Sequence, residues 1–321
     1  MNKEMLSLGI DTSNYKTSVA VTAADGEILF NYQSFLNVKS GERGLRQSEA
    51  LFQHVQKLPE ALENAFETKG VRGRIGAVSV SARPRPVTGS YMPVFTAGQG
   101  AARSIAASIG VPLYEFSHQE GHIEAVKHYS AMADEKRLIC FHFSGGTTEA
   151  LLYDEDISSI EIIGGSLDLA YGQVLDRIGV AMGYNFPCGH EMDMLALSVD
   201  HEKIDKDLLT RVKVKDGYVN LSGIETQCQR ILEKQERSHE NLSASLMYEL
   251  SRSVADMTIF LSEKYHIKSF LYAGGVSCSN FMRNYLDKNM PAYIRTVFGA
   301  PELSSDNAVG ISLLGGKKLW L

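Results

Sequence analysis

Two histidines separated by three residues are the feature of this sequence that most directly suggests chemistry. His118 and His122 lie in the segment Ser-His-Gln-Glu-Gly-His at 117–122. Side chains four residues apart lie on one face of a helix, so two imidazoles with this spacing can bind one metal ion. The same spacing also arises often by chance, so two ordinary helix histidines remain the alternative when the pair is considered alone.

Two polar turns have the residue types that bind an anion. Asp-Thr-Ser at 11–13 follows the apolar segment 5–10, and Ser-Gly-Gly-Thr at 144–147 follows the apolar segment 138–143. Such turns can point backbone N–H groups and hydroxyls at a phosphate. Each turn taken alone is typical of a plain hairpin. Because the two turns occupy matching places in two halves of the chain, a nucleotide site becomes an equal alternative.

The elements that must position these residues form two similar series. In the first, apolar patterns predict strands at 5–10, 16–22, 27–36, 75–81 and 111–116, and helices at 47–69, 96–109 and from the histidine pair to about 129. In the second, they predict strands at 138–143, 149–153, 160–163 and 269–273, and helices at about 168–183, 189–199, 242–265, 280–288 and 308–318. A polar stretch fills 200–240.

This duplication predicts an α/β fold with two βββαβαβα lobes and a cleft between them. It is the layout of the actin, hexokinase and Hsp70 (ASKHA) superfamily. We expect residues 1–128 to form the N-terminal lobe, completed by a C-terminal helix at about 301–321, and residues 129–300 to form the other lobe.

Composition limits the classes of partner. The 321 residues are 44% hydrophobic and 22% charged, with a net charge of -6, which is typical of a globular protein without a basic coat. A nucleic-acid partner would then need a local basic patch or a helper subunit. Arg-Val-Lys-Val-Lys at 211–215 predicts an amphipathic strand with a solvated face, with RNA contact as the alternative.

Cytoplasmic residence is expected from three features. No run of eighteen apolar residues could span a membrane, and the first strand begins too early for a signal peptide. The four cysteines are scattered and form no CxxC pair, as in reduced thiols: Cys140, Cys188, Cys228 and Cys278.

Several motifs, taken together, resemble those of the TsaD family, once labelled glycoproteases. Their order and spacing match over essentially the whole chain. The matching segments are 9–13, 117–122, 143–148, 176–189, 222–224, 273–277 and 305–307.

The resemblance implies an acyltransferase that acts on tRNA. Family members transfer threonylcarbamoyl from threonylcarbamoyl-adenylate to N6 of an adenosine near the anticodon. The resemblance also implies one divalent ion per subunit, iron or zinc, bound by His118, His122 and Asp306. A Lewis acid there would neutralise charge that develops during acyl transfer. Implied partners are tRNA, a TsaB-like paralogue and a small TsaE-like ATPase, and no catalytic side chain is assigned.

The resemblance further implies which residues bind an adenine nucleotide or acyl-adenylate. Some cradle the phosphate or carbamoyl group, some hold the ribose and base, and some form the turn under the adenine. In that order they are Ser144, Gly145 and Gly146; Asp176, Gly189 and Asp193; and Gly274, Gly275 and Ser279.

The sequence departs from the family pattern at several positions, four of which bear directly on the expected sites. Tyr15 and Lys16 replace two acids, which reverses the charge beside the expected phosphate site. Gln173 replaces a glutamate, and Glu225 replaces a lysine. A paralogue that binds metal and nucleotide but acts on another carbamoyl or anionic substrate, or serves as an assembly subunit, is therefore the alternative function.

Charges in the loop after the fourth strand raise a similar question. Arg83 and Arg85 lie in a stretch that replaces a Gly-Pro-Gly-Leu motif of the family. They would favour an anionic ligand if they faced the cleft, and an ordinary solvated loop is the alternative.

Two further interpretations concern the metal. We hypothesise that His142, two residues before Ser144, is a fourth ligand, with a hydrogen-bonded core histidine as the alternative. A helical zinc peptidase needs HExxH, and Gln119 stands where its glutamate would act as base, so peptidase activity is not expected.

An ATP-driven kinase or hydrolase is a further class of enzyme to which the two turns could belong. The first turn lacks the acids that are usual in such enzymes.

Overall fold

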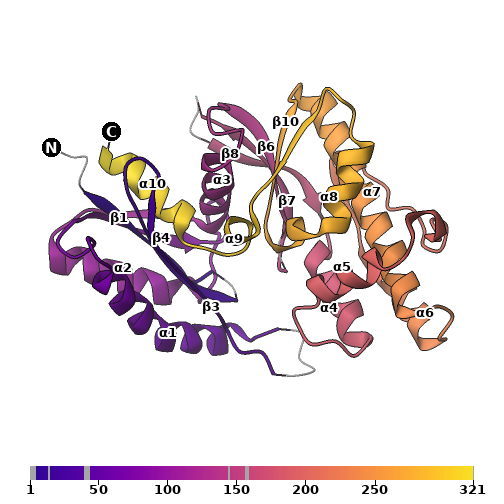
Figure 1. Ribbon diagram of the computed structural model, residues 1–321, viewed down its shortest axis with the longest axis horizontal. Helices are drawn as coiled ribbons and strands as arrows, with labels where there is room; N and C mark the ends of the chain where they lie inside the picture. The colour runs from indigo at the N-terminus through magenta and orange to yellow at the C-terminus, as the bar shows by residue number, and fades with distance from the viewer. Residues whose placement is uncertain (1–4, 14, 40–43, 144, 156–158, 321) are drawn as a thin grey trace. The chain divides into compact units, whose positions relative to one another are not determined.

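The computed structural model describes residues 5–13, 15–39, 44–143, 145–155 and 159–320. The chain divides into two compact units, each built around one sheet (Figure 1). The first unit contains the described residues of Met1–Asn37, Leu45–Ala133 and Ala300–Leu321, and the second those of Val38–Gly44 and Asp134–Gly299.

The first unit is a five-stranded sheet covered by helices on both faces. Its strands lie in the order β3-β2-β1-β4-β5, with β1, β4 and β5 parallel and β2 antiparallel to both neighbours. Helices α1 and α2 cover one face, and α3 and α10 cover the other (Figure 1). The elements are β1 (Leu6–Asp11), β2 (Lys16–Thr22), β3 (Ile28–Phe35), α1 (Gln47–Glu67), β4 (Ile75–Arg83), α2 (Phe95–Ile109), β5 (Leu113–Ser117), α3 (His118–His128), α9 (Pro301–Ser304) and α10 (Val309–Trp320).

The second unit repeats this topology with an insertion. Its sheet has the order β11-β10-β6-β7-β8-β9, which without β9 is the order of the first sheet. The elements are β6 (Arg137–Phe143), β7 (Thr148–Asp154), β8 (Ser159–Ser166), α4 (Tyr171–Ala181), α5 (Gly189–Leu197), the 3-10 turn η2 (His201–Lys203), β9 (Tyr218–Val219), α6 (Ser222–Glu233), α7 (His239–Tyr265), β10 (Ser269–Ala273), the 3-10 turn η3 (Gly275–Cys278), α8 (Asn280–Asn289) and β11 (Arg295–Phe298). The predicted α/β duplication is therefore confirmed.

Apolar burial explains why the central strands form where they do. Every residue of β1 and β2 is buried, as are the described residues of β10 and nearly all of β4 and β6. Strands with helices on both faces lose both faces from water, so they read as continuous apolar runs. Each unit has its own apolar core, which in the first includes Leu8, Ile10 and Val80 and in the second includes Phe141 and Tyr272.

The sequence predictions were wrong mainly between residues 200 and 240 and near the C-terminus. The polar stretch contains α6 and β9, and 211–215 forms no strand beyond one bridge between Lys215 and Tyr218. There Arg211 pairs with Asp256, and the Val212 N–H donates to Glu249. This segment is held by side chains that are distant in sequence. An alternating pattern within the segment carries no information about such partners. β11 and α9 were also missed, being four residues each.

Helices α3 and α10 approach each other through glycines. A Cβ at Gly310 would lie 1.9 Å from the carbonyl oxygen of Gly121 and 2.8 Å from the nitrogen of Ala125. Backbone atoms cannot yield as a flexible side chain can, so only glycine permits this approach. Because α3 carries both histidines and α10 begins shortly after Asp306, the contact sets how closely these groups can meet.

We predict that Gly310→Ala destabilises the fold by about 1–3 kcal/mol, the usual cost of overpacking. Gly100→Ala is the matched control, because an added Cβ on this exposed glycine of α2 meets nothing within 4 Å. Because alanine has a higher helix propensity than glycine, Gly100→Ala should leave the free energy of unfolding unchanged or raise it by up to about 1 kcal/mol. Urea unfolding followed by circular dichroism measures both, and equal stability of the two variants would contradict the argument.

Candidate functional site

The histidine pair lies in the first two turns of α3. Ser117 caps this helix: its hydroxyl accepts from the Glu120 N–H at 3.2 Å, and the Glu120 carboxylate accepts from the Ser117 N–H at 2.6 Å. This reciprocal capping box satisfies two of the backbone donors that a helix start leaves open. It therefore defines where the helix begins and places His118 and His122 on one face.

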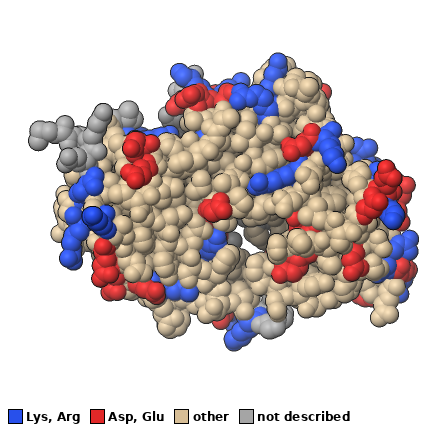
Figure 2. Space-filling model, viewed as in Figure 1, with Lys and Arg blue, Asp and Glu red and all other residues tan. Residues whose placement is uncertain are grey.

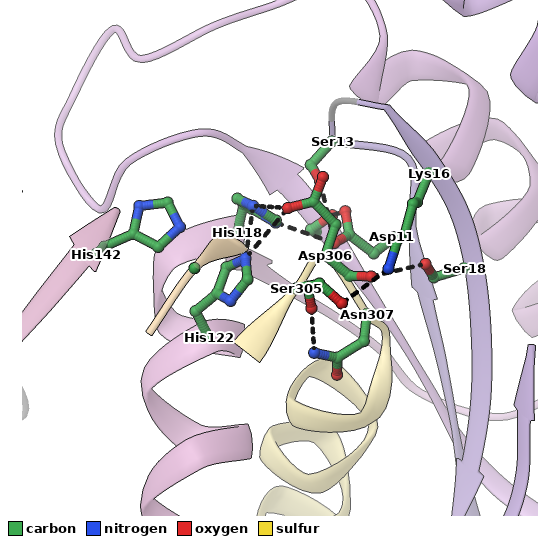
Figure 3. Close-up of polar contacts among 12 residues, drawn as sticks. Asp11, Ser13, Lys16, Ser18, His118, His122, His142, Ser305, Asp306 and Asn307 are labelled. Atoms are coloured by element: carbon green, nitrogen blue, oxygen red, sulfur yellow. Dashed lines mark hydrogen bonds and ion pairs between the residues drawn. The ribbon is translucent and has the colours of Figure 1, made fainter. Parts of the chain in front are cut away.

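His118, His122 and Asp306 converge on one point (Figure 3). The two Nε2 atoms are 3.0 Å apart, and Asp306 Oδ1 lies 3.5 Å from that of His118 and 3.4 Å from that of His122. Ligands bound about 2.0–2.1 Å from a tetrahedral ion are themselves about 3.3–3.4 Å apart. The three atoms are therefore spaced as ligands of one ion would be.

The loop that carries Asp306 is tied down by hydrogen bonds. The amide of Asn307 donates to the carbonyls of Leu303 and Ser305 at 2.8 Å each, and its Oδ1 accepts from the Val309 N–H at the start of α10. Asp306 is thus presented by a short connection anchored at both ends, between α9 and α10.

Asp11 belongs to the same cluster and was missed as a site residue. Its Oδ2 lies 2.9 Å from His118 Nδ1, and its side chain is 1% exposed. Residues 11–13 were predicted to form an anion-binding turn, whereas the Asp11 carboxylate accepts hydrogen bonds within the fold. The signal that could have identified it is an acid at the carboxyl end of β1, a strand that is parallel to β5 and separated from it in the sheet only by β4.

The buried charges set the pKa values of the cluster. Burial alone would lower the pKa of His118, but the carboxylates of Asp11 and Asp306 outweigh it and raise that pKa to about 10. Burial and the neighbouring His118 lower the pKa of His122. Burial acts to raise the pKa of Asp306, but hydrogen bonds from both histidines hold it well below its usual range. The two carboxylates thus favour positive charge on His118, whereas burial and the neighbouring His118 disfavour it on His122.

His142 lies in the second unit, on β6. Its side chain is 1% exposed, and its Nδ1 lies 3.4 Å from the hydroxyl of Thr147. The contact with Thr147 agrees with the alternative of a hydrogen-bonded core histidine. Its role as a fourth ligand stays a prediction.

The two glycine turns predicted to bind a nucleotide lie at the carboxyl ends of neighbouring parallel strands. β6 and β10 pair directly, and a Cβ at Gly274, which has φ of 92°, would lie 2.0 Å from the carbonyl oxygen of Phe143. The end of β10 therefore passes against the end of β6, where ligands bind in open α/β sheets. Ser144 lies outside the described residues. Gly145, Gly146 and Gly275 are described in these turns.

Asp176 lies beside the first of these turns. Its Oδ1 accepts from the Cys188 N–H at 2.8 Å, one residue before Gly189, and a Cβ at Gly145 would lie 3.9 Å from its Oδ2. Burial raises the pKa of Asp176 to about 6, although the Cys188 N–H opposes that shift. The structure therefore brings Gly145, Asp176 and Gly189 together.

Asp193 caps the start of α8. Its Oδ1 accepts from the Ser279 hydroxyl at 2.5 Å and from the Phe281 N–H at 3.1 Å, and its Oδ2 accepts from the Asn280 N–H at 2.9 Å. Asp193 and Ser279 were predicted to bind a ligand. In the structure they bond to each other, and Asp193 joins α5 to α8.

Comparison with known proteins identifies the family. The sequence model of TsaD, described as tRNA N6-adenosine threonylcarbamoyltransferase, matches residues 31–313. This chain belongs to the TsaD family. It is 29% identical over 332 residues to a protein of that name from Geobacillus thermodenitrificans, covering 100% of this chain and 93% of the relative. It is likewise 29% identical over 326 residues to one from Bacillus subtilis, covering 98% and 90%.

Similar solved structures support the ASKHA fold of this TsaD member. HypF of T. kodakarensis matches with a TM-score of 0.62 and 16% identity, covering 98% of this chain and 47% of that one. A ROK family glucokinase from Streptomyces griseus matches with a TM-score of 0.53 and 11% identity, covering 97% and 99%. At such identities the likeness shows the fold alone.

Lys16, one of the predicted departures from the family pattern, makes contacts within the first unit. It is 7% exposed, and its ammonium donates to Gln33 at 2.9 Å and to Ser305 at 2.8 Å while lying 4.6 Å from the centre of the Phe35 ring. The backbone carbonyl of Tyr15 accepts from the Leu36 N–H. Lys16 therefore ties β2 and β3 to the loop of Asp306.

The other departures also have local partners. Gln173 accepts from the Ala170 N–H at the start of α4, and Glu225 accepts from Gln229 within α6. Arg83 lies 3.8 Å from Glu120 with its side chain 37% exposed, which agrees with the solvated-loop alternative. The Arg85 N–H donates to Ser90.

In the wild-type chain, the buried Asp176 should make the free energy of unfolding fall as the pH rises from about 4 to about 6. We predict that Asp176→Asn reduces this fall. The folded-state pKa of about 6 exceeds the unfolded value of about 3.9, so the folded chain binds more protons between them and stability falls as pH rises. At about 1.4 kcal/mol per pKa unit, the effect is up to about 3 kcal/mol.

Urea unfolding at pH 4 and pH 7 measures the difference. Asp287→Asn, on an exposed position of α8, is the charge-matched control and should retain the wild-type dependence. If Asp176→Asn keeps the wild-type pH dependence, burial does not raise the pKa of the Asp176 carboxyl group.

Proposed function

We propose that this chain transfers a threonylcarbamoyl group from threonylcarbamoyl-adenylate to N6 of a tRNA adenosine near the anticodon, and that a bound metal is required. Membership in the TsaD family supports the class of reaction, which is acyl transfer. The observation that carries the metal dependence is the convergence of His118, His122 and Asp306 at ligand spacing.

The donor set suits a divalent iron or zinc ion. Two imidazole nitrogens and one carboxylate oxygen are ligands these metals accept, whereas magnesium prefers oxygen ligands alone. His118, His122 and Asp306 would hold the ion, with His142 proposed as a fourth ligand. When bound, the metal would supply a Lewis acid that stabilises negative charge on the carbamoyl group.

We propose that the acyl-adenylate binds at the carboxyl ends of β6 and β10. Backbone N–H groups of Gly145 and Gly146 would donate to the phosphate or carbamoyl oxygens, and the Asp176 Oδ2 beside Gly145 would accept from a ribose hydroxyl. Gly189 and the Gly274-Gly275 turn would line the base. Asp193 and Ser279 would act through α8, since their hydrogen bonds hold the start of that helix.

The tRNA would bind with the help of partner subunits. Over the face drawn in Figure 2, basic and acidic side chains of the described residues are interspersed, and the chain carries a net charge of -6. Counterion release from phosphates needs clustered lysine and arginine. We therefore include in the proposal a complex with a TsaB-like paralogue and a TsaE-like ATPase.

The cytoplasm is the proposed location. None of the described helices has the length and apolar composition needed to cross a membrane. Four cysteines, all among the described residues, form no disulfide: Cys140, Cys188, Cys228 and Cys278.

The other functions considered are less well supported. Family membership does not favour a paralogue with a different substrate. A helical zinc peptidase would need a glutamate where Gln119 stands. That side chain is 1% exposed.

We predict that His118→Ala, His122→Ala and Asp306→Ala each lose the bound metal and lower tRNA modification at least about 100-fold, the usual effect of removing one electrostatic stabiliser. His128→Ala, on the same helix, is the matched control. The assay supplies threonylcarbamoyl-adenylate, tRNA and partner subunits, and measures the modified nucleoside by mass spectrometry and the metal by elemental analysis.

Two results would contradict the proposal in different ways. If the wild-type chain modifies tRNA and His118→Ala does so equally well, the metal is not required. If the wild-type chain gives no product while a TsaD relative works under the same conditions, the transferase assignment is wrong.

A further inference from the structure

Asp11 is held by more hydrogen bonds than a carboxylate at the end of a strand requires. Its Oδ1 accepts from the Ser81 hydroxyl at 2.5 Å, and its Oδ2 accepts from the Ser13 hydroxyl at 3.1 Å. The third partner is His118 Nδ1, 2.9 Å from Oδ2. Since the side chain is 1% exposed, these three groups take the place of water around the carboxylate.

The sheet itself fixes this arrangement. β1 and β4 are parallel, and Ile10 lies opposite Val80. Asp11 and Ser81 are the next residues of the two strands, so they come close to each other toward the carboxyl ends. Both strands are central and buried. The carboxylate therefore stands on a rigid element, and its direction is set before any ligand arrives.

We propose that Asp11 is a positioning residue for the metal centre: it accepts the Nδ1–H of His118, which leaves Nε2 of that ring toward His122 and Asp306, and it is not itself a metal ligand. An ionised carboxylate can only accept, so the ring nitrogen that faces it must carry the proton. The opposite nitrogen is then the one available to a metal. This inference rests on the proposed metal centre and adds a residue to it.

The hydrogen bonds also explain why Asp11 stays out of the ligand set. Ser81 engages one oxygen, while Ser13 and His118 engage the other. Loss of a carboxylate that orients a metal-bound histidine in this way lowers metal affinity by about 10- to 100-fold.

The test compares zinc binding by Asp11→Asn, Ser81→Ala and Asp25→Asn with the wild-type chain. Asp25 is an exposed acid in the β2–β3 turn and is the matched control. Zinc affinity is measured by competition with a chromophoric chelator. Nitrogen-15 NMR of histidine-labelled, zinc-loaded protein reports which ring nitrogen of His118 carries the proton, a readout that a merely structural role would not move.

We expect Asp11→Asn to weaken zinc binding about 10- to 100-fold and to shift or remove the His118 Nδ1–H resonance. Ser81→Ala, which keeps the charge but loosens the carboxylate, should weaken binding by less, and Asp25→Asn should match the wild type. If Asp11→Asn fails to fold, Ser81→Ala alone must show the weakened binding and the altered resonance.

Three outcomes would overturn the inference. One is wild-type affinity and an unchanged His118 resonance in Asp11→Asn. The second, when Asp11→Asn does not fold, is a wild-type result for Ser81→Ala. The third is X-ray absorption that shows one fewer oxygen ligand to zinc in Asp11→Asn, which would make Asp11 a ligand. Absence of zinc binding by the wild-type chain would instead refute the proposed metal centre, so the two failures are distinguishable.

Discussion

Two carboxylates on either side of one buried imidazole are the interaction around which the polar cluster of the first unit is arranged. Asp11 faces Nδ1 of His118, and Asp306 faces Nε2. Removing such charges from water is costly unless they are paired and hydrogen-bonded, so the surrounding fold must hold both acids in place. β1 supplies one of them, and the loop before α10 supplies the other.

Close packing and buried polar contacts then bring these sources together. The glycine contact between α3 and α10 lets two backbones approach where any other residue would collide. Lys16, an apparent reversal of charge in the sequence, ties β2 to Ser305 beside Asp306. A substitution that looks like a change in ligand chemistry thus has a structural contact that accounts for it.

The two units share a sheet topology but carry different residues in the segment that follows their first strand. In each unit a turn follows the first strand of the same five-strand order. In the first unit, Asp11 at that position accepts hydrogen bonds from side chains of the fold. In the second, Asp176 lies beside Gly145 of the corresponding segment, and burial raises its pKa to about 6.

The sequence by itself determined the α/β duplication, most strands and helices, the histidine pair and its family, because apolar periodicity and motif order are local or ordered along the chain. Tertiary structure alone decided the partners: Asp11 with His118, Asp193 with Ser279, and Arg211 with Asp256. These pairs are separated by 107, 86 and 45 positions, and no periodic pattern encodes which distant side chains meet. Short elements such as β11 were missed for a related reason, since four residues carry too little pattern and form through pairing with β10.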